Sequence, residues 1–219
     1  MAAIVTLNQD STSVQYLCKK DKRLAKVISR IGPITYEPHT DNPFSFLIHE
    51  IIEQMLSVKA GAKSYGRFEE SCDGQITPDA IATLSVEEIK AIGTSTAKAN
   101  YIKSAALAIL TGELDFTKFP DMTDEATLKE LVSLHGIGTL TAKMYLIFIL
   151  DRQDILPFED VAFLQSYKWL YKTEDVSKAS IEKKCKKWKP YSSIAARFLY
   201  RALDMGFTKE EFHLYKNSI

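Results

Sequence analysis

The sequence predicts an all-α fold, and three observations support this class. Apolar residues recur at helical spacing, capping residues and glycine or proline stops mark helix ends, and no segment alternates apolar and polar residues as a half-buried strand does. Together these signals predict helices over about 13–31, 43–58, 59–72, 78–84, 85–93, 96–110, 123–134, 139–150, 160–171, 177–188, 192–205 and 208–215.

The first helices are predicted from amphipathic spacing and from a glycine stop. Residues 13–31 form a basic amphipathic pattern that ends at Gly32. Residues 43–58 place apolar side chains, including Met55, at the spacing of a core-facing helix stripe. We therefore expect Met55 to lie within a helix.

Capping sequences mark the helices that follow. Thr77-Pro78 places a cap before a first-turn proline. Ser85-Val-Glu-Glu88 has the pattern of a capping box, in which the two polar side chains bond each other's backbone amides. Gly112 ends the long helix predicted over 96–110.

Length and composition suit one domain or two small ones with a cleft between them. The 219-residue chain balances 28 basic residues with 28 acidic ones, which argues against a protein that coats nucleic acid through a large positive field. Basic clusters at 19–23 and 183–189 are interpreted as solvated helix faces. Because there is no run of about 20 apolar residues and no signal peptide, we expect an intracellular protein that does not span a membrane.

The most informative segment is a hairpin between two predicted helices, Leu-Val-Ser-Leu-His-Gly-Ile-Gly-Thr-Leu-Thr-Ala-Lys over residues 131–143. Its glycines allow backbone conformations that other residues disfavour, and they leave amides bare at a helix N-terminus, where an anion can bind. Such contacts would hold a DNA backbone without reading its sequence; the alternative is a plain helix connection. The residues expected to contact DNA here are Gly136, Gly138, Thr139, Thr141 and Lys143.

A weak internal similarity accompanies the hairpin. Gly93-Thr-Ser-Thr-Ala-Lys98 resembles Gly138-Thr-Leu-Thr-Ala-Lys143, and each lies between two predicted helices. The first copy lacks the leading Gly-x-Gly, so we expect it to be the poorer phosphate site. Shared rules of helix packing explain the similarity as well as common ancestry does.

A carboxylate, Asp160, follows Pro157 by three residues and starts an apolar helix. The simpler interpretation is an N-cap, which is a frequent role for aspartate. The amides of a helix N-terminus would also keep the carboxylate ionised. An anion held in this way could stabilise a cationic sugar centre or orient a water molecule, with Glu159 as the competing candidate.

Several motifs together resemble a known family. Leu134-His-Gly-Ile-Gly-Thr-Leu-Thr-Ala142, with the downstream Pro157-Phe-Glu-Asp160, resembles the helix-hairpin-helix signature of DNA glycosylases. Ile51–Ala60, Leu110–Asp115 and Trp188-Lys-Pro-Tyr191 are similar to further segments of that family. Over about residues 43–205 the chain therefore resembles the 3-methyladenine DNA glycosylase II branch of the helix-hairpin-helix (HhH-GPD) family.

The resemblance assigns roles residue by residue. It makes Asp160 the catalytic carboxylate and places Gln54 in the segment that inserts into the duplex. Met55 falls at the wedge that fills the gap left by an extruded nucleotide, and Ser57 would lie near the opposite strand. Without the resemblance, Met55 would be interpreted as a core residue.

The predicted base pocket also comes from the resemblance. Tyr200 falls at an aromatic position that lines the pocket, and Leu140 and Met144 fall at two positions that are aromatic in a well-known bacterial member. The pocket is therefore expected to be less aromatic than in that member. His135 stands where proline is usual in the hairpin, and Ser192 where arginine often follows Trp-x-Pro-Tyr.

The resemblance implies a single unit, residues 1–219, in which two helical subdomains flank a DNA-binding cleft. One subdomain would comprise about 1–105 together with 190–219. The other would comprise about 106–189, and would contain both the hairpin at 131–143 and Asp160.

The implied activity is that of a monofunctional DNA glycosylase in base excision repair. It would flip out alkylated purines such as 3-methyladenine and 7-methylguanine, hydrolyse the N-glycosidic bond and leave an abasic site. Strand cleavage is not expected, because Leu140 stands at the lysine position of bifunctional relatives; Lys143 is the nearby residue that could change this. Cys18, Cys72 and Cys185 are too few for the iron–sulfur branch.

Two alternatives stay open, namely a catalytically silent binder of damaged DNA and a glycosylase for neutral deaminated or oxidised bases. The expected partner is double-stranded DNA with alkylated bases, bound by a monomer inside the cell. No metal or cofactor is expected, although hairpins of this family can hold a monovalent cation with their carbonyls.

Overall fold

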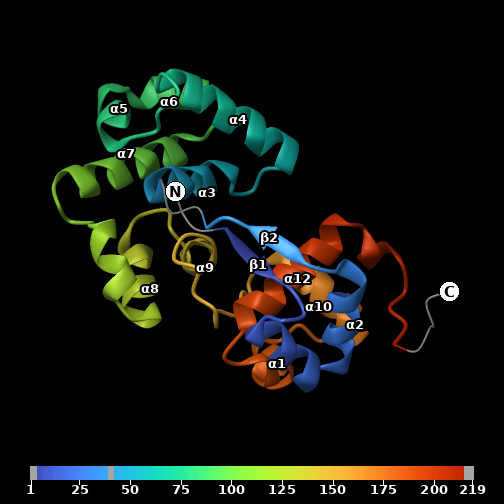
Figure 1. Cartoon of the computed structure of the whole chain (residues 1–219). Coiled ribbons are helices and arrows are strands. Elements are labelled where there is room, and N and C mark those ends of the chain that lie inside the picture. The colour runs from blue at the N-terminus through green and yellow to red at the C-terminus, as the bar shows by residue number, and fades with distance from the viewer. Residues whose placement is uncertain (1–3, 39–41, 215–219) are drawn as a thin grey trace. The chain divides into compact units, whose positions relative to one another are not determined.

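The computed structural model describes residues 4–38 and 42–214, which form two compact units (Figure 1). One, here called the hairpin unit, has the described residues 42–150. The other, here called the terminal unit, combines residues 4–38 with 151–214. Each unit buries its own cluster of apolar side chains.

The hairpin unit is helical throughout its secondary structure. The helix α3 packs against α4, α7 and α9, while α7 also packs against α5 and α6, and α8 pairs with α9 (Figure 1). Phe116 stacks on Tyr145 in the core, and Phe119 meets Tyr145 edge-on. The elements are α3 (Pro43–Glu53), α4 (Val58–Ser71), α5 (Pro78–Thr83), α6 (Val86–Ala91), α7 (Thr96–Leu110), the 3-10 helix η1 (Phe116–Asp121), α8 (Asp124–Ser133) and α9 (Thr139–Phe148).

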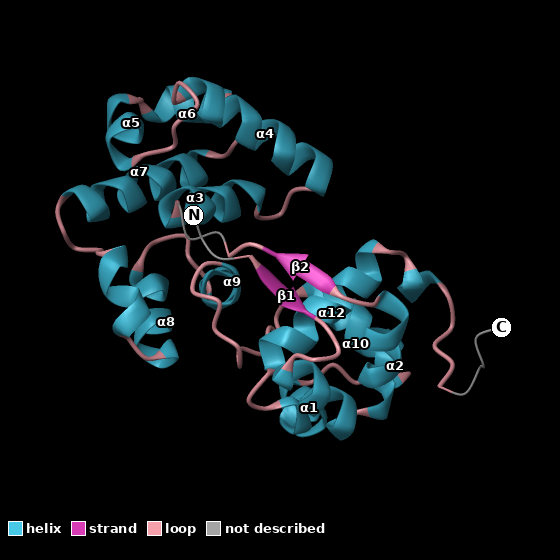
Figure 2. Cartoon of the chain, in the orientation of Figure 1, coloured by secondary structure: helices cyan, strands magenta, loops and turns pink. Residues whose placement is uncertain are grey.

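The terminal unit contains two short strands besides its helices. The strands pair antiparallel (Figure 2). In this pairing Thr6 lies opposite Thr35. The last long helix, α12, packs against α1, α2 and α10. The elements are β1 (Val5–Leu7), α1 (Thr12–Lys20), α2 (Lys22–Ile31), β2 (Ile34–Tyr36), α10 (Val161–Tyr171), α11 (Lys178–Cys185), η2 (Lys186–Trp188), α12 (Ser192–Asp204) and η3 (Phe207–Lys209).

The predicted all-α class is confirmed, and several predicted caps have the expected geometry. The Thr77 hydroxyl accepts the Ala80 amide at the start of α5. At α6 both halves of the capping box form between Ser85 and Glu88. The two strands were not predicted, because three residues each are too few to establish an alternating pattern.

One predicted helix is broken in two. The expected helix over 13–31 divides at Asp21, whose extended backbone ends α1 and whose carboxylate accepts the amides of Arg23 and Leu24 to cap α2. The cap lies inside a run of basic residues, which resembles one continuous solvated face in the sequence. The expected helix over 208–215 is also wrong, because only the short η3 forms, ending at Lys209, and no helix follows it up to residue 214; Tyr215 lies outside the described residues.

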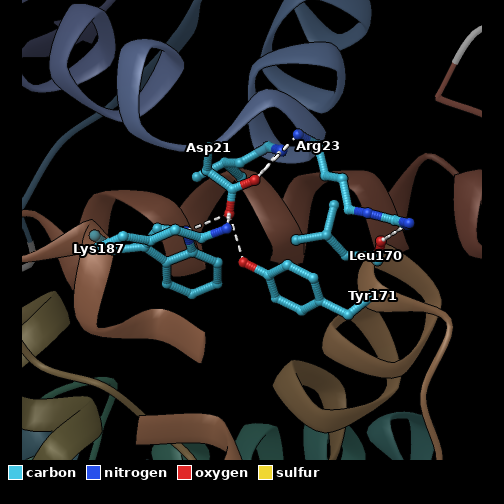
Figure 3. Close-up of polar contacts among 7 residues, drawn as sticks. Asp21, Arg23, Leu170, Tyr171 and Lys187 are labelled. Carbon is cyan, nitrogen blue, oxygen red and sulfur yellow. Dashed lines mark hydrogen bonds and ion pairs between the residues drawn. The ribbon is translucent and has the colours of Figure 1, made fainter. Parts of the chain in front are cut away.

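Asp21 is almost fully buried and joins distant segments of the terminal unit (Figure 3). Its Oδ2 accepts hydrogen bonds from the Tyr171 hydroxyl at 2.5 Å and the Trp188 indole at 2.9 Å, and it lies 3.0 Å from the Lys187 ammonium. Burial alone opposes ionisation, but these donors outweigh it and hold the pKa of Asp21 below its usual value. The carboxylate therefore fixes α1, α2, α10 and η2 together.

The two units do not follow the predicted subdomains, whose boundaries were near 105 and 190. The observed boundaries fall near residues 38 and 150, so the hairpin belongs to one unit and Asp160 to the other. The reason is long-range packing, because the first 38 residues contribute α1, α2 and β2 to the core that α10 and α12 build.

Candidate functional site

Different structural features explain the two glycines of the hairpin. Gly136 adopts φ +88°, and a Cβ there would lie 2.3 Å from the ring of Tyr101, so both conformation and space require glycine. Gly138 is extended, at φ −90°, and a Cβ there would meet nothing within 4 Å. The prediction that both glycines need special backbone freedom is therefore wrong for Gly138.

Gly138 instead leaves the first turn of α9 without a side-chain cap. Every other α-helix described in the hairpin unit has an N-cap side chain that accepts an amide of its first turn, whereas Gly138 at α9 offers none. Thr139 is exposed beside these amides. Helix N-terminal amides that lack a cap are suited to bind an anion such as a phosphate.

Two predicted phosphate contacts lie deeper than expected. Thr141 is 6% exposed and Lys143 is 9% exposed, both on the buried side of α9. The sequence did not indicate this, because every residue from Thr141 to Ile147 is buried and α9 therefore lacks the polar stripe that would mark an exposed face. The exposed part of the predicted anion site is thus the backbone near Gly138 and Thr139.

The two similar segments also correspond in the structure, but their alignment is shifted by two residues from the one that the sequence suggested. Gly93 adopts φ +105° and lies two residues before Ser95, the N-cap of α7, as Gly136 lies two residues before Gly138. Gly93 therefore corresponds to Gly136 and not to Gly138. Ser95 accepts the Lys98 amide, so this first connection has the side-chain cap that the second one lacks.

The predicted wedge lies in the connection between α3 and α4. The helix α3 ends at Glu53 rather than at 58, and Met55 turns the chain with φ +60°. The Met55 side chain is fully exposed, so the interpretation of Met55 as a helical core residue is wrong. Ser57 is exposed and caps α4 by accepting the Ala60 amide.

Gln54 ties this connection to the hairpin. Its side-chain amide donates a hydrogen bond of 2.9 Å to the carbonyl of Gly136. The turn that presents Met55 and the turn that precedes α9 are thus linked directly within one unit. The hairpin carbonyl of Leu134 also accepts a hydrogen bond, from the Ile137 amide, so a cation at this hairpin would share oxygens already in use.

Lys98 is a residue that the sequence reasoning did not assign. From α7, its ammonium donates to the carbonyls of Ile52 at 2.7 Å and Gln54 at 2.5 Å, at the C-terminal end of α3. Burial lowers the pKa of Lys98 from its usual value. The only sequence signal was its place in the internal similarity, which gave no indication of these partners.

Asp160 caps α10 in the terminal unit, as its position in the sequence predicted. One carboxylate oxygen accepts the Phe163 amide at 2.9 Å and the other accepts the Ala162 amide at 3.4 Å. The side chain is half-buried. An ionised carboxylate has about four acceptor positions, so the cap leaves others for a water molecule or a sugar.

The loop that leads to Asp160 is anchored on the start of α12. Ser193 donates its amide to the Gln153 carbonyl, and its hydroxyl accepts the Ile155 amide at 2.9 Å. Ser192, at the position where arginine often occurs in the family, donates its hydroxyl to Asp154 at 2.6 Å. These buried serines position the loop, a role that the sequence did not indicate for either of them.

The residues predicted to line a base pocket are divided between the units. Tyr200 is half-buried on α12, in the same unit as Asp160, while Leu140 and Met144 lie on α9 of the hairpin unit. A cavity of about 320 Å³ in the terminal unit is lined by residues of β1, α1 and α2 and by Phe198 of α12, and it does not include Asp160 or Tyr200. It is therefore not the predicted pocket.

The part of the chain that the structure describes has neither a metal-binding cluster nor a helix able to span a membrane. It contains no group of three or more His, Cys, Asp or Glu side chains placed to hold a metal ion. None of its helices combines the length and apolar character that crossing a membrane requires.

The fold and these motifs define the class of protein. The profile of the HhH-GPD superfamily of base excision DNA repair proteins matches residues 48–190, which include both the hairpin and Asp160. The chain therefore belongs to this superfamily.

Individual relatives match almost the whole chain. DNA-3-methyladenine glycosylase 1 of Schizosaccharomyces pombe is 27% identical over 211 residues, covering 94% of this chain and 92% of the relative. The crystal structure of a DNA-3-methyladenine glycosidase from Bacillus halodurans has a TM-score of 0.84 at 32% identity, covering 96% and 97%. The 3-methyladenine DNA glycosylase of S. pombe in complex with abasic DNA has a TM-score of 0.79 at 26% identity, covering 89% and 97%.

Proposed function

We propose that this protein is a monofunctional DNA glycosylase that removes alkylated purines such as 3-methyladenine and 7-methylguanine from double-stranded DNA. The observation that carries the proposal is Asp160, held at a helix N-terminus in a chain similar over nearly its full length to proteins named 3-methyladenine glycosylases. The reaction would be the first step of base excision repair, in the compartment that holds the DNA.

The chemistry of alkylated purines fits a site with one carboxylate. Alkylation at N3 or N7 makes the purine cationic, so the base leaves readily and needs little general acid. As the N-glycosidic bond breaks, positive charge develops on the sugar, and the Asp160 carboxylate would stabilise it and orient the attacking water. The two amides that bind Asp160 fix the orientation of its carboxylate.

The hairpin unit would supply DNA binding and base extrusion. The amides of α9 that lack a side-chain cap suit a backbone phosphate, which positions the duplex without reading its sequence. The exposed Met55 would fill the space left by the flipped nucleotide. Gln54 supports this assignment, because it bonds the wedge connection to the hairpin.

Leu140 supports hydrolysis without strand cleavage. Bifunctional members of the family use a lysine as a Schiff-base nucleophile at this position, and leucine cannot form that adduct. Lys143 lies three residues further along α9 and is 9% exposed. The expected product is therefore an abasic site in an uncut strand.

Product analysis of damaged duplexes tests the proposal. Methylated DNA is incubated with the protein, released bases are identified by chromatography, and strand nicking is measured before and after alkali. A matched duplex with a neutral lesion, such as hypoxanthine, is treated in parallel. We expect release of 3-methyladenine or 7-methylguanine, and nicks only after alkali.

Other outcomes identify the alternatives. Faster release of the neutral base would replace the proposed substrate class. Nicks without alkali would show lyase activity and point to Lys143. Binding of damaged DNA without release of either base would make the protein a silent binder.

A further inference from the structure

The C-terminal end of α3 is held by a lysine from another helix. An α-helix leaves its last carbonyls without partners inside the helix, and they need donors from elsewhere when they are not solvated. Here the Lys98 ammonium donates to the Ile52 carbonyl at 2.7 Å and to the Gln54 carbonyl at 2.5 Å. The second of these carbonyls immediately precedes Met55.

The connection after this point is short and its backbone is strained at Met55. Met55 adopts φ +60°, which an unbranched L-residue rarely occupies, and only Leu56 and Ser57 separate it from α4. The base of the connection is tight, because a Cβ at Gly61 of α4 would lie 2.9 Å from the Glu53 side chain. Contacts on both sides thus restrict the backbone that carries the fully exposed Met55 side chain.

We propose that Lys98 is a positioning residue for base extrusion, which holds the Met55 wedge in its inserting conformation through the carbonyls of Ile52 and Gln54. This inference rests on the proposed function, and it gives the segment Gly93–Lys98, at the start of α7, a part in that function. The hairpin before α9 also contacts this turn, through the hydrogen bond from the Gln54 side chain to the Gly136 carbonyl. Lys98 itself touches neither the substrate nor Asp160 in this role.

The same helix provides a matched control. Lys103, five residues along α7, donates to the carbonyls of Ile81 at 3.2 Å, Ala82 at 3.0 Å and Leu84 at 2.7 Å, at the C-terminal end of α5. Lys98 and Lys103 are both half-buried and both bind the end of a neighbouring helix. They differ in that only the Lys98 partners adjoin Met55.

The test compares Lys98→Met and Lys103→Met, which keep the apolar stem and remove the ammonium. Binding is measured to a duplex with a tetrahydrofuran abasic-site analogue and to the undamaged duplex. We expect Lys98→Met to lower the preference for the abasic analogue by about tenfold, equivalent to about 1.4 kcal/mol. Lys103→Met is expected to leave the preference unchanged, and Lys98→Arg to restore part of it.

A double-mutant cycle separates positioning from general stability. If Lys98 acts through Met55, Lys98→Met has little further effect on the preference once Met55→Ala is present. An equal loss in both backgrounds, or an equal loss for Lys98→Met and Lys103→Met, overturns the inference. A wild-type protein that shows neither base release nor a preference for the abasic analogue would instead contradict the proposed function itself.

Discussion

At the scale of single residues, the two hairpin glycines can be distinguished by experiment. Gly136→Ala combines a left-handed backbone with a Cβ 2.3 Å from Tyr101, and we expect it to destabilise the protein by about 2 to 4 kcal/mol. Gly138→Ala has neither problem and is expected to fold with nearly wild-type stability. Urea denaturation measures both, and equal losses for the two variants would contradict this assignment.

Asp21 gives a second prediction at this scale. Asp21→Asn removes the charge that binds Lys187 and an acceptor for Tyr171 and Trp188, so we expect a loss of about 3 kcal/mol at pH 7. The pKa of Asp21 is lowered in the folded state, so its ionised form adds stability above the ordinary aspartate value and loses that contribution as the pH falls.

The lowered pKa of Asp21 determines how its contribution to stability depends on pH. The difference in unfolding free energy between wild type and Asp21→Asn should be largest near neutral pH and should narrow as the pH falls below about 4. Urea denaturation at several pH values measures it. A gap that stays constant down to pH 2 would show that ionisation of Asp21 does not stabilise the fold.

Single residues also show where sequence reasoning is sufficient. Asp160 was predicted as a helix cap because the signal is local: an aspartate directly before an apolar helix. Asp21 caps a helix in the same way, but its other partners, Tyr171 and Trp188, are 150 and 167 residues away. Pairing at that distance leaves no pattern in one sequence.

At the scale of elements, the helix starts were more predictable than the helix ends. The starts of α5 and α6 carry local caps that the sequence displays. The end of α3 has neither glycine nor proline, and Lys98 and Gln54 fix it by contacts with other elements. The apolar Met55 therefore extended the predicted helix past its true end.

The N-terminus of α9 carries an element-scale prediction. Gly138→Asp would add a side chain that caps α9, because the residue is already extended and has open space around its Cβ. We expect unchanged or slightly higher stability, but about tenfold weaker binding of undamaged duplex DNA, since the carboxylate occupies the amides and repels phosphate.

The matching control uses the other helix connection. Ser95→Asp puts the same charge at the N-cap of α7, where a side-chain cap already exists. DNA binding by both variants is measured in a fluorescence-anisotropy titration with undamaged duplex. We expect Ser95→Asp to bind like the wild type. Equal weakening by Ser95→Asp and Gly138→Asp would mean that added charge alone, and not the α9 amides, explains the effect.

At the scale of the whole molecule, the class of fold was predictable, but the boundaries of its two compact units were not. Helical periodicity and family motifs indicated an all-α member of the superfamily, and the profile match confirms it. The boundaries near 38 and 150 depend on β1 pairing with β2 and on α2 packing against α12, which are long-range contacts. Local patterns do not encode such pairings.

The central claim is that Asp160 performs the chemistry in addition to capping α10. Asparagine caps a helix about as well as aspartate, so Asp160→Asn separates the two roles. The deciding measurement is single-turnover release of 3-methyladenine and 7-methylguanine from methylated DNA, with Glu159→Gln as the neighbouring control and urea denaturation to verify folding. We expect Asp160→Asn to retain stability and DNA binding but to release base at least about 100-fold more slowly. Release at the wild-type rate by Asp160→Asn would remove this carboxylate from the mechanism, and a loss confined to Glu159→Gln would assign the role to its neighbour.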